Sequence, residues 1–471
     1  MSYKRSILFL SVFFCCGLIH AQTLNQKLQT AFARLEQDTQ CKYASVSLNV
    51  LDAKTGETVF AAHPNMGLAT ASTLKTITSV TAFNLLGKDF QYQTTLGYNG
   101  KVAADGTLTG DLIIKGGGDP TLGSWRYESS KENTVLKIWV EAIHKAGIKK
   151  VEGKIIGDDT VFGTQKIPDG WIWQDVGNYY GAGTSGLCWR ENQFDLKLQQ
   201  TQVENPVKII KTVPQMPYLQ FSNELLTGNS GSGDNAYAYL PVQNSMVYLR
   251  GTYADDLTKR SISVAVSDPA FDVAFRLADT LKKAGIEVSG SAESTEMLLK
   301  AHQEMPVAKQ IISIISSPKL SEIIFWLNKK SINLYAEQLL KTIALKAGKP
   351  VTTANGVSVL KDYWKAKGID PNTLNIFDGS GLSPGNRVTT ATLASILASA
   401  KKEIWFPDFL QSLPIYNGMT MKSGSINSVL AYAGYQTKNG KELCFSVIVN
   451  NYSGKTSGIK TKIFKVLDEL K

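Results

Sequence analysis

The middle of the chain differs in character from both ends, and this difference most limits how the chain can fold. Before residue 97 the segment YASVSLNVLDAKTGETVFAAH predicts two strands around a turn, and a helix follows them. Residues 97–305 instead alternate short apolar runs with glycines, as in KVAADGTLTGDLIIKGGG. Helical patterns return from about residue 307. Because 471 residues exceed what one core usually holds, we predict a multidomain α/β protein interrupted by a β-rich insert.

The C-terminal segments indicate how the two ends of the chain combine. TMKSGSI, LAYAGYQT and ELCFSVIVNN predict three successive strands, and Asn439-Gly440 between the last two is a strong hairpin signal. We predict that residues 22–96 and 306–471 form one domain, an antiparallel sheet flanked by helices. The insert, 97–305, is predicted to hold two domains, about 97–195 with 266–305, and about 196–265.

The first residues have the order of a secretory signal peptide. Lys4 and Arg5 precede the apolar run ILFLSVFFCCGLI, and HAQ follows it. We therefore expect residues 1–21 to be removed and the protein to be exported to the periplasm or another extracytoplasmic part of the envelope. The run is short for a membrane span and no later segment is longer and apolar, so we predict no span in the mature chain.

Charge and cysteine usage narrow the classes of ligand. The formal charge of +10 suits an anionic environment such as nucleic acid, a membrane surface or an acidic cell-wall polymer, and plain solubility explains it equally well. Since no run of lysines or arginines occurs, we predict no nucleic-acid partner. Cys41, Cys188 and Cys444 are too widely spaced for a zinc site, and we favour buried free thiols over a single disulfide.

A serine and a lysine three residues apart are the first candidates for catalysis. In GLATASTLKTITSVTAFNLLG, Ser72 and Lys75 open a predicted helix whose apolar residues recur at helical spacing. The same S-x-x-K spacing also occurs at Ser316/Lys319, Ser358/Lys361, Ser399/Lys402 and Ser457/Lys460. Pro318 interrupts the first of these, and the other three are not followed by the partner motifs described below.

The scarcity of histidine favours a lysine as the base. The chain has only four histidines, and none lies in a local pattern typical of a serine, histidine and aspartate triad. A lysine can act as a base only if its pKa falls from about 10.4 toward neutrality. Burial and a second nearby cation both lower it. The hypothesis therefore requires another lysine and a hydroxyl close to Lys75.

Two later motifs supply these groups. NKKSINLYAEQLL contains Ser331-Ile332-Asn333 before a predicted helix, and MTMKSGSINS contains Lys422-Ser423-Gly424 on a predicted strand. Each motif is weak alone, because S-x-N also occurs at Ser47/Asn49 and K-[ST]-G at Lys54-Thr55-Gly56. The order of the three motifs and their settings favour the set that begins at Ser72.

This ordered set resembles that of serine β-lactamases and penicillin-binding proteins. The chain is similar to the low-molecular-mass penicillin-binding proteins that act as D-Ala-D-Ala carboxypeptidases and endopeptidases, in the subgroup with a large insert. The segments GGGDPTL, GDDTVF, GWIWQDVGNYYGA and DGSGLSPGNRV extend the resemblance. Three positions depart from the pattern: Ser423 replaces a commoner threonine, Pro384 replaces a basic residue, and Cys188 replaces a polar residue.

The resemblance implies a role for each motif residue. Ser72 is the expected nucleophile, Lys75 its base, and Ser331 the relay to the leaving amine. Asn333 orients Lys75, and a charged Lys422 lowers the pKa of Lys75 and attracts the substrate carboxylate. The resemblance also implies backbone donors to the oxyanion at Ser72 and Ser425. The remaining expected substrate-binding residues are Ser423, Gly424, Ser425, Asp158 and Arg387. By the same resemblance, Asp158 is expected to face the amino end of a diaminopimelate stem peptide.

The resemblance implies a transpeptidase-like core for the domain formed by residues 22–96 and 306–471. It also implies peptidoglycan peptides as substrates, β-lactams as covalent inhibitors, and no metal or organic cofactor. Two other functions stay open at this point. A serine β-lactamase shares the three motifs, although it would not use so long an insert, and a non-catalytic envelope-binding protein would share the fold. The preference for carboxypeptidase or endopeptidase action, the third residue of the stem peptide, and a homo-oligomeric state also stay open.

Overall fold

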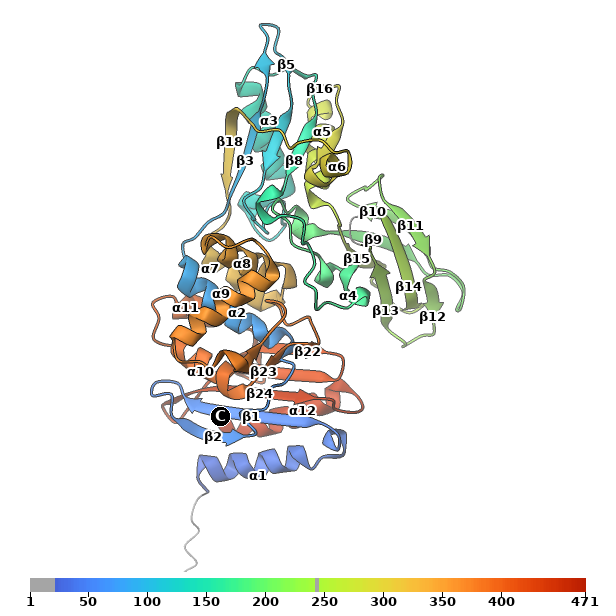
Figure 1. The fold of residues 1–471 in the computed structure, drawn as a ribbon. Helices are drawn as coiled ribbons and strands as arrows, with labels where there is room; N and C mark the ends of the chain where they lie inside the picture. Colours follow the sequence, from blue (N-terminus) through green and yellow to red (C-terminus); the bar gives the residue numbers. More distant parts are fainter. Residues whose placement is uncertain (1–21, 242–244) are drawn as a thin grey trace, which may run out of the picture.

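The protein is described by a computed structural model that covers residues 22–241 and 245–471. Its helices and strands form three parts, which Figure 1 shows at the bottom, at the top and to one side. The predicted signal segment, 1–21, lies outside the described residues. Within them, we find no helix that combines the length and the apolar character needed to cross a membrane.

The first part contains the predicted sheet shared by the two ends of the chain. It has six antiparallel strands in the order β2-β1-β24-β23-β22-β21. Asn439 and Gly440 have φ angles of 49° and 77° in the turn between β23 and β24, which confirms the predicted hairpin. The strands are β1 Ser45–Asp52, β2 Thr58–Ala62, β21 Ile415–Tyr416, β22 Met419–Ile426, β23 Val429–Lys438 and β24 Lys441–Asn450.

Helices cover both faces of this sheet (Figure 1). Alternate residues of β24 point to opposite faces: Phe445 and Val447 pack with α1 and α12, whereas Cys444 packs with the helices on the other side. The first face is covered by α1 Leu24–Glu36 and α12 Thr456–Leu467. The helices on the other side are α2 Leu74–Leu86, α7 Leu320–Lys330, α8 Asn333–Lys346, α9 Thr353–Ala366, α10 Thr390–Ala400 and α11 Phe406–Ser412.

The second part is built on a mixed five-stranded sheet in the order β17-β8-β6-β3-β18. Its strands are β3 Gln93–Tyr98, β6 Leu112–Lys115, β8 Ile155–Asp158, β17 Ala292–Ser294 and β18 Gln310–Ser316. The helices α3 Glu132–Lys145 and α5 Pro269–Lys283 share its apolar core, and α6 is Thr295–Lys300. A smaller sheet consists of β4 Lys101–Val102, β5 Thr107–Thr109, β7 Lys150–Val151 and β16 Glu287–Val288.

The third part is all β apart from one short helix beside it, α4 Trp173–Val176. Two sheets enclose a common apolar core that includes Phe194, Leu249 and Val264. One sheet consists of β9 Gln193–Gln199, β10 Lys208–Val213 and β15 Ser261–Ala265. The other consists of β11 Gln220–Asn223, β12 Leu226–Gly228, β13 Asp234–Tyr239 and β14 Met246–Ala254.

The strand pairing bears on where the insert begins and ends. β3 pairs with both β18 and β6, so these strands belong to the sheet of the insert. β3 starts before the predicted boundary at 97, and β18 lies beyond the predicted boundary at 305. We propose that the insert begins with β3 and ends with β18, because backbone pairing holds these two strands to the insert.

Cys41, Cys188 and Cys444 are free and buried, which confirms the prediction of buried thiols. Burial raises the pKa of both Cys188 and Cys444 to about 12, so neither is a thiolate in neutral water.

Candidate active site

Ser72 lies in a short 3₁₀ turn, Ala71–Thr73, that leads directly into α2. Lys75 follows one helical turn later, and its Nζ donates a 2.9 Å hydrogen bond to Ser72 Oγ. The sequence predicts that one apolar stripe of this helix is buried. The structure buries more than that stripe, since every residue from Leu74 to Phe83 is buried. The helix therefore runs through the core and carries Lys75 into it.

The Lys75 amine is enclosed by acceptors. Besides Ser72, its Nζ donates to Asn333 Oδ1 at 2.5 Å and to the Ser380 carbonyl at 2.7 Å. Burial lowers the pKa of Lys75 to about 7, although the nearby charges of Asp378 and Glu337 act in the opposite direction. A substantial fraction of the amine is therefore neutral near pH 7 and able to accept a proton from Ser72.

Ser331 and Asn333 lie where α7 ends and α8 begins. Ser331 adopts a left-handed conformation with φ of 57° at the end of α7, and Asn333 is the first residue of α8. A non-glycine residue held in this region is strained by about 1–3 kcal/mol, and such strain is often found at functional sites. Asn333 uses both ends of its amide, since Oδ1 accepts from Lys75 and Nδ2 donates to the Tyr180 carbonyl at 2.7 Å.

Lys422 brings the second amine of the set from β22. It is buried, and its Nζ donates to Ser331 Oγ at 2.9 Å and to the Ser423 carbonyl at 2.7 Å. Burial, and then the charge of Lys75, lower the pKa of Lys422 well below its ordinary value. The two amines are therefore within electrostatic reach of each other, as the lysine-base hypothesis requires.

The electrostatics differ from expectation in one respect. The resemblance implies that a charged Lys422 lowers the pKa of Lys75, but the main cause of the lowered pKa of Lys75 is burial. Repulsion between the two amines adds to burial in lowering the pKa of Lys422. Two buried amines that repel each other do not both hold a proton easily, so protonation of one disfavours protonation of the other.

Gly424 explains why β22 can approach the nucleophile so closely. A Cβ at this position would lie 2.6 Å from the Thr70 carbonyl oxygen and 2.7 Å from the backbone nitrogens of Ser72 and Thr73. Only a glycine allows β22 to pack directly against the turn that carries Ser72. This packing brings the next residue, Ser425, to the wall of the cavity that also contains Ser72.

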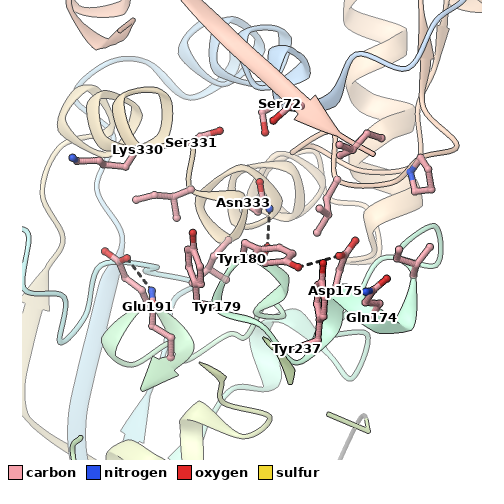
Figure 2. A pocket seen from close by; sticks show the side chains of 18 of the residues that line it. Ser72, Gln174, Asp175, Tyr179, Tyr180, Glu191, Tyr237, Lys330, Ser331 and Asn333 are labelled. Carbon is pink, nitrogen blue, oxygen red and sulfur yellow. Dashed lines mark hydrogen bonds between the residues drawn. The ribbon is translucent and has the colours of Figure 1, made fainter. Parts of the chain in front are cut away.

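That cavity has a volume of about 590 Å³ and is shown in Figure 2. Ser72, Ser331 and Asn333 face it, with side chains of the insert on the opposite wall (Figure 2). Tyr180 donates to Asp175 across 3.3 Å on that wall. The lining residues from the insert are Arg126, Ile172, Gln174, Asp175, Tyr179, Tyr180, Glu191, Gln193 and Tyr237.

Two buried carboxylates support the loop behind Lys75. Glu337 accepts from the backbone nitrogens of Gly379 and Ser380, which fixes the Ser380 carbonyl against the Lys75 amine. Asp378 accepts from the backbone of the same loop and from Trp171 Nε1 at 2.9 Å, so the insert also holds this loop. The segments SINLYAE and DGSGLSPGNRV contain these two residues and resemble the family, but the sequence alone assigned no role to Glu337 or Asp378.

The insert is joined to the catalytic part through α8. Tyr335 OH donates to Glu191 Oε1 at 2.8 Å. Gln338 Nε2 donates to the Gly118 and Ser185 carbonyls and to Cys188 Sγ. Cys188 is thus part of a buried contact between the insert and α8, the helix that begins with Asn333.

The structure does not bring every predicted residue into the cavity. Asp158 accepts from Thr160 and lies 3.7 Å from the Lys115 amine, away from the cavity lining. Arg387 donates to the carbonyls of Pro384 and Asn386, and it does not line the cavity either.

Sequence reasoning missed Asp175, an acidic residue that lines the cavity. Its segment GWIWQDVGNYYGA extends the resemblance to the family, but only the aromatic residues of that segment drew attention, and Asp175 was given no role. In the described ranges, no group of three or more histidine, cysteine, aspartate or glutamate side chains is arranged to hold a metal ion.

Comparisons with known proteins agree with the geometry. The chain is 26% identical over 444 residues to a D-alanyl-D-alanine carboxypeptidase of Actinomadura sp. (strain R39), covering 89% of this chain and 80% of that protein. It is 28% identical over 419 residues to the D-alanyl-D-alanine carboxypeptidase DacB of Haemophilus influenzae, covering 84% of this chain and 83% of that protein.

A solved structure confirms the predicted fold. The crystal structure of penicillin binding protein 4 (dacB) from Haemophilus influenzae matches with a TM-score of 0.77 at 22% identity, covering 94% of this chain and 98% of the other. Residues 28–469 match the D-Ala-D-Ala carboxypeptidase 3 (S13) family, which is nearly all of the described chain. The chain therefore belongs to the D-Ala-D-Ala carboxypeptidase 3 (S13) family.

Proposed function

We propose that this member of the family cleaves the terminal D-Ala-D-Ala bond of peptidoglycan stem peptides with Ser72 as its nucleophile. One observation carries the assignment: Lys75 Nζ is 2.9 Å from Ser72 Oγ and has a pKa of about 7. A neutral lysine beside a hydroxyl at the start of a buried helix is a competent general base.

In the acylation step, Ser72 Oγ attacks the carbonyl carbon of the penultimate D-Ala, and its proton passes to the Lys75 amine. The negative charge then forms on the carbonyl oxygen, where the backbone N–H groups of Ser72 and Ser425 are the proposed donors. The contact between Gly424 and the backbone around Ser72 supports this pair, since it brings the two segments together.

Breakdown of the tetrahedral intermediate requires a proton for the leaving amine. Ser331 Oγ accepts a hydrogen bond from Lys422 and faces the cavity, so it is the proposed relay of that proton. The carbon to nitrogen bond breaks, D-alanine leaves, and an ester to Ser72 remains. Water then attacks the ester, which restores the Ser72 hydroxyl and releases the shortened peptide.

The terminal carboxylate of the substrate would bind near Lys422 and Ser425. An opposite charge favours the protonated amine, so binding of this carboxylate would raise the pKa of Lys422 again. Lys422 would thus be charged in the complex, as the resemblance implied, although its pKa is low in the free protein. Ser425 lines the cavity, whereas Ser423 does not.

Asp175 is the proposed partner for a cationic group on the stem peptide, in place of Asp158. It lines the wall opposite Ser72, and its side chain is oriented by the hydroxyl of Tyr180 (Figure 2). Partial burial raises the pKa of Asp175, so a ligand ammonium group would stabilise its ionised form. This contact would select a third stem residue with a free amine.

Covalent trapping by β-lactams and export follow from the same proposal. The Haemophilus influenzae protein has been solved in complex with a β-lactam. In this chain, the equivalent reaction would acylate Ser72.

Export to the envelope would place the enzyme beside its polymeric substrate. A homo-oligomeric state stays a prediction.

The test is digestion of purified muropeptides by the full-length protein and by Ser72→Ala, with mass analysis of the products. We expect loss of one D-alanine from pentapeptide stems with the native protein and none with the variant. Benzylpenicillin should add its mass to the native protein only. Rapid repeated hydrolysis of a chromogenic cephalosporin would instead identify a β-lactamase, and the absence of any covalent adduct would favour a binding protein.

A further inference from the structure

A second cavity, of about 560 Å³, adjoins the catalytic one on the side of α7 and α11. Arg126 lines both cavities, so the two are neighbours and meet at this side chain. The lining residues of the second cavity are Arg126, Tyr127, Glu128, Ser129, Pro318, Ser321, Glu322, Phe325, Trp326, Asp408 and Gln411. None of the catalytic residues proposed above belongs to this lining, so it is a separate site.

The junction between the cavities is held rigidly. Arg126 Nε donates to Glu191 Oε1 at 2.8 Å, and Glu191 also accepts from Ser124 and Tyr335. The Arg126 guanidinium lies 5.3 Å from the ring centre of Trp125 and 5.4 Å from that of Trp326. Its position is therefore fixed by both an ion pair and two aromatic rings.

The turn that carries Glu191 supports a functional role for this junction. Arg190, Glu191 and Asn192 have consecutive positive φ angles of 53°, 55° and 52°. Three neighbouring non-glycine residues in this region are strained, and strain of this kind persists where the surrounding structure holds it for function. The strained turn places the buried carboxylate of Glu191, which is 1% exposed, against Arg126.

The lining of the second cavity indicates which ligands it suits. Phe325 and Trp326 offer partly buried aromatic surface, with their rings at 86° to each other. Three carboxylates line the same cavity, from Glu128, Glu322 and Asp408. Glu128 is paired with Lys131 and Asp408 with Lys88, while Arg126 is paired with Glu191. A polyanionic ligand would find no unpaired cation in this lining. A neutral ligand with many hydroxyl donors and an apolar ring face fits both features, and sugars have this chemistry.

We propose that the second cavity binds an N-acetylhexosamine unit of the glycan strand to which the stem peptide is attached. The inference rests on the proposed function, because a stem peptide in the catalytic cavity is covalently linked to such sugars. The C–H face of a pyranose ring would pack on the Trp326 ring, and its edge would contact Phe325, because the two rings are at 86° to each other. Its hydroxyls would donate to Asp408 and Glu322, and Gln411 offers both a donor and an acceptor.

The test compares two substrates with the same pentapeptide, one carrying the N-acetylglucosaminyl-N-acetylmuramyl disaccharide and one without sugar. We expect the full-length protein to have a higher kcat/KM for the disaccharide substrate. Trp326→Ala and Asp408→Ala should each lower the ratio of the two kcat/KM values by about five- to tenfold, mainly through KM. Asp408 lies on the surface, with a side chain 37% exposed, so its variant should fold even if Trp326→Ala does not.

Tyr43→Ala is the matched control, since Tyr43 is an aromatic residue 74% exposed and outside both cavities. It should leave the ratio unchanged. Equal kcat/KM values for both substrates in the native protein, or a ratio unaffected by both variants, would overturn the inference. A third outcome would also overturn it. If both variants lower the cleavage of a sugar-free cross-linked peptide dimer as much as that of the disaccharide substrate, the cavity binds a second stem peptide instead of a sugar. Failure to release D-alanine from either substrate would instead contradict the proposed function.

Discussion

The helices on the two sides of the six-stranded sheet are of opposite character. On one face, α1 and α12 bury only a stripe of apolar residues, such as Leu28, Phe32 and Ile463, and keep their charged residues outside. On the other, α2 and α8 are buried on all sides and carry Lys75, Asn333 and Glu337 into the interior. The first face stabilises the fold, whereas the second holds polar groups that become reactive because they are buried.

The comparison shows what burial does to a titratable group. A buried lysine is unfavourable as a cation, and this penalty lowers its pKa. The interior of the second face contains enough acceptors to hold Lys75 in place without keeping it fully protonated. Burial of Lys75 therefore costs stability but produces a base that works near neutral pH. The substitutions below should distinguish the catalytic role of one face from the stabilising role of the other.

Lys75→Met should have the largest effect on function. Removing the base should lower the rate of acylation by benzylpenicillin by about 10²–10⁴-fold. The free energy of unfolding should not fall, because a buried amine is replaced by an apolar side chain of similar length. Stopped-flow acylation and thermal unfolding measure the two effects. Acylation within tenfold of the native rate would show that Lys75 is not the base.

Ile463→Ala should have the opposite profile. Ile463 is fully buried between α12 and the sheet, so its truncation should lower the free energy of unfolding by about 2–5 kcal/mol. The acylation rate at 25 °C should stay within twofold, because nothing on this face touches Ser72. Urea unfolding and the same acylation assay give the comparison. A large fall in acylation by the folded variant would show that the two faces are coupled.

Gly424→Ala should disturb the oxyanion site. The added Cβ would lie 2.6 Å from the Thr70 carbonyl, so β22 would have to move away from Ser72. We expect acylation to fall by about 10²–10³-fold, as when one oxyanion donor is lost. Thr420→Ala, on the same strand, is the control and should acylate normally. Equal rates in both variants would argue against Ser425 as a donor.

The acylation rate should depend on pH through Lys75. Its pKa is lowered to about 7, so below this pH the amine becomes protonated and cannot accept the Ser72 proton. We expect a plateau above pH 8 and a fall of about tenfold per pH unit below pH 6. Single-turnover acylation over pH 5–10 tests this, and a midpoint near 10 would indicate an ordinary exposed lysine.

The lowered pKa of Lys75 also makes the free energy of unfolding depend on pH. In the unfolded chain Lys75 stays protonated up to about 10.5, whereas in the folded protein it loses its proton near 7. Between these values the unfolded state binds more protons, so the contribution of Lys75 makes the free energy of unfolding rise with pH. Lys75→Met should remove this part of the pH dependence.

Asp175→Asn should have the smallest effect. It keeps an acceptor for Tyr180 but removes the charge offered to a ligand amine. We expect KM to rise by about tenfold for a stem peptide with a free amine at its third residue. KM for the same peptide with that amine acetylated should not change. Equal effects on both peptides would show that Asp175 does not recognise the amine.

Much of the catalytic centre could be predicted from short-range patterns. The spacing of Ser72 and Lys75 places them on one helix face, and TMKSGSI, which contains Lys422, is predicted as the first of three successive strands. Asp158 and Arg387 show where such patterns fail. Nothing local to either residue indicates that its side chain turns to Thr160 or to the Pro384 carbonyl instead of the cavity. Asp175 was missed for the same reason, because a single acidic residue carries no signal of what it faces.

By itself, the sequence determined the order of the elements, the hairpin at Asn439-Gly440 and the three motifs, because these depend on neighbours within a few residues. Only the tertiary structure decided that Lys75 is buried, that β22 touches the turn of Ser72, and that two cavities meet at Arg126. The physical reason is that a pKa, a close contact and a cavity depend on which groups surround a point in space. Those groups come from parts of the chain hundreds of residues apart, and no local pattern contains them.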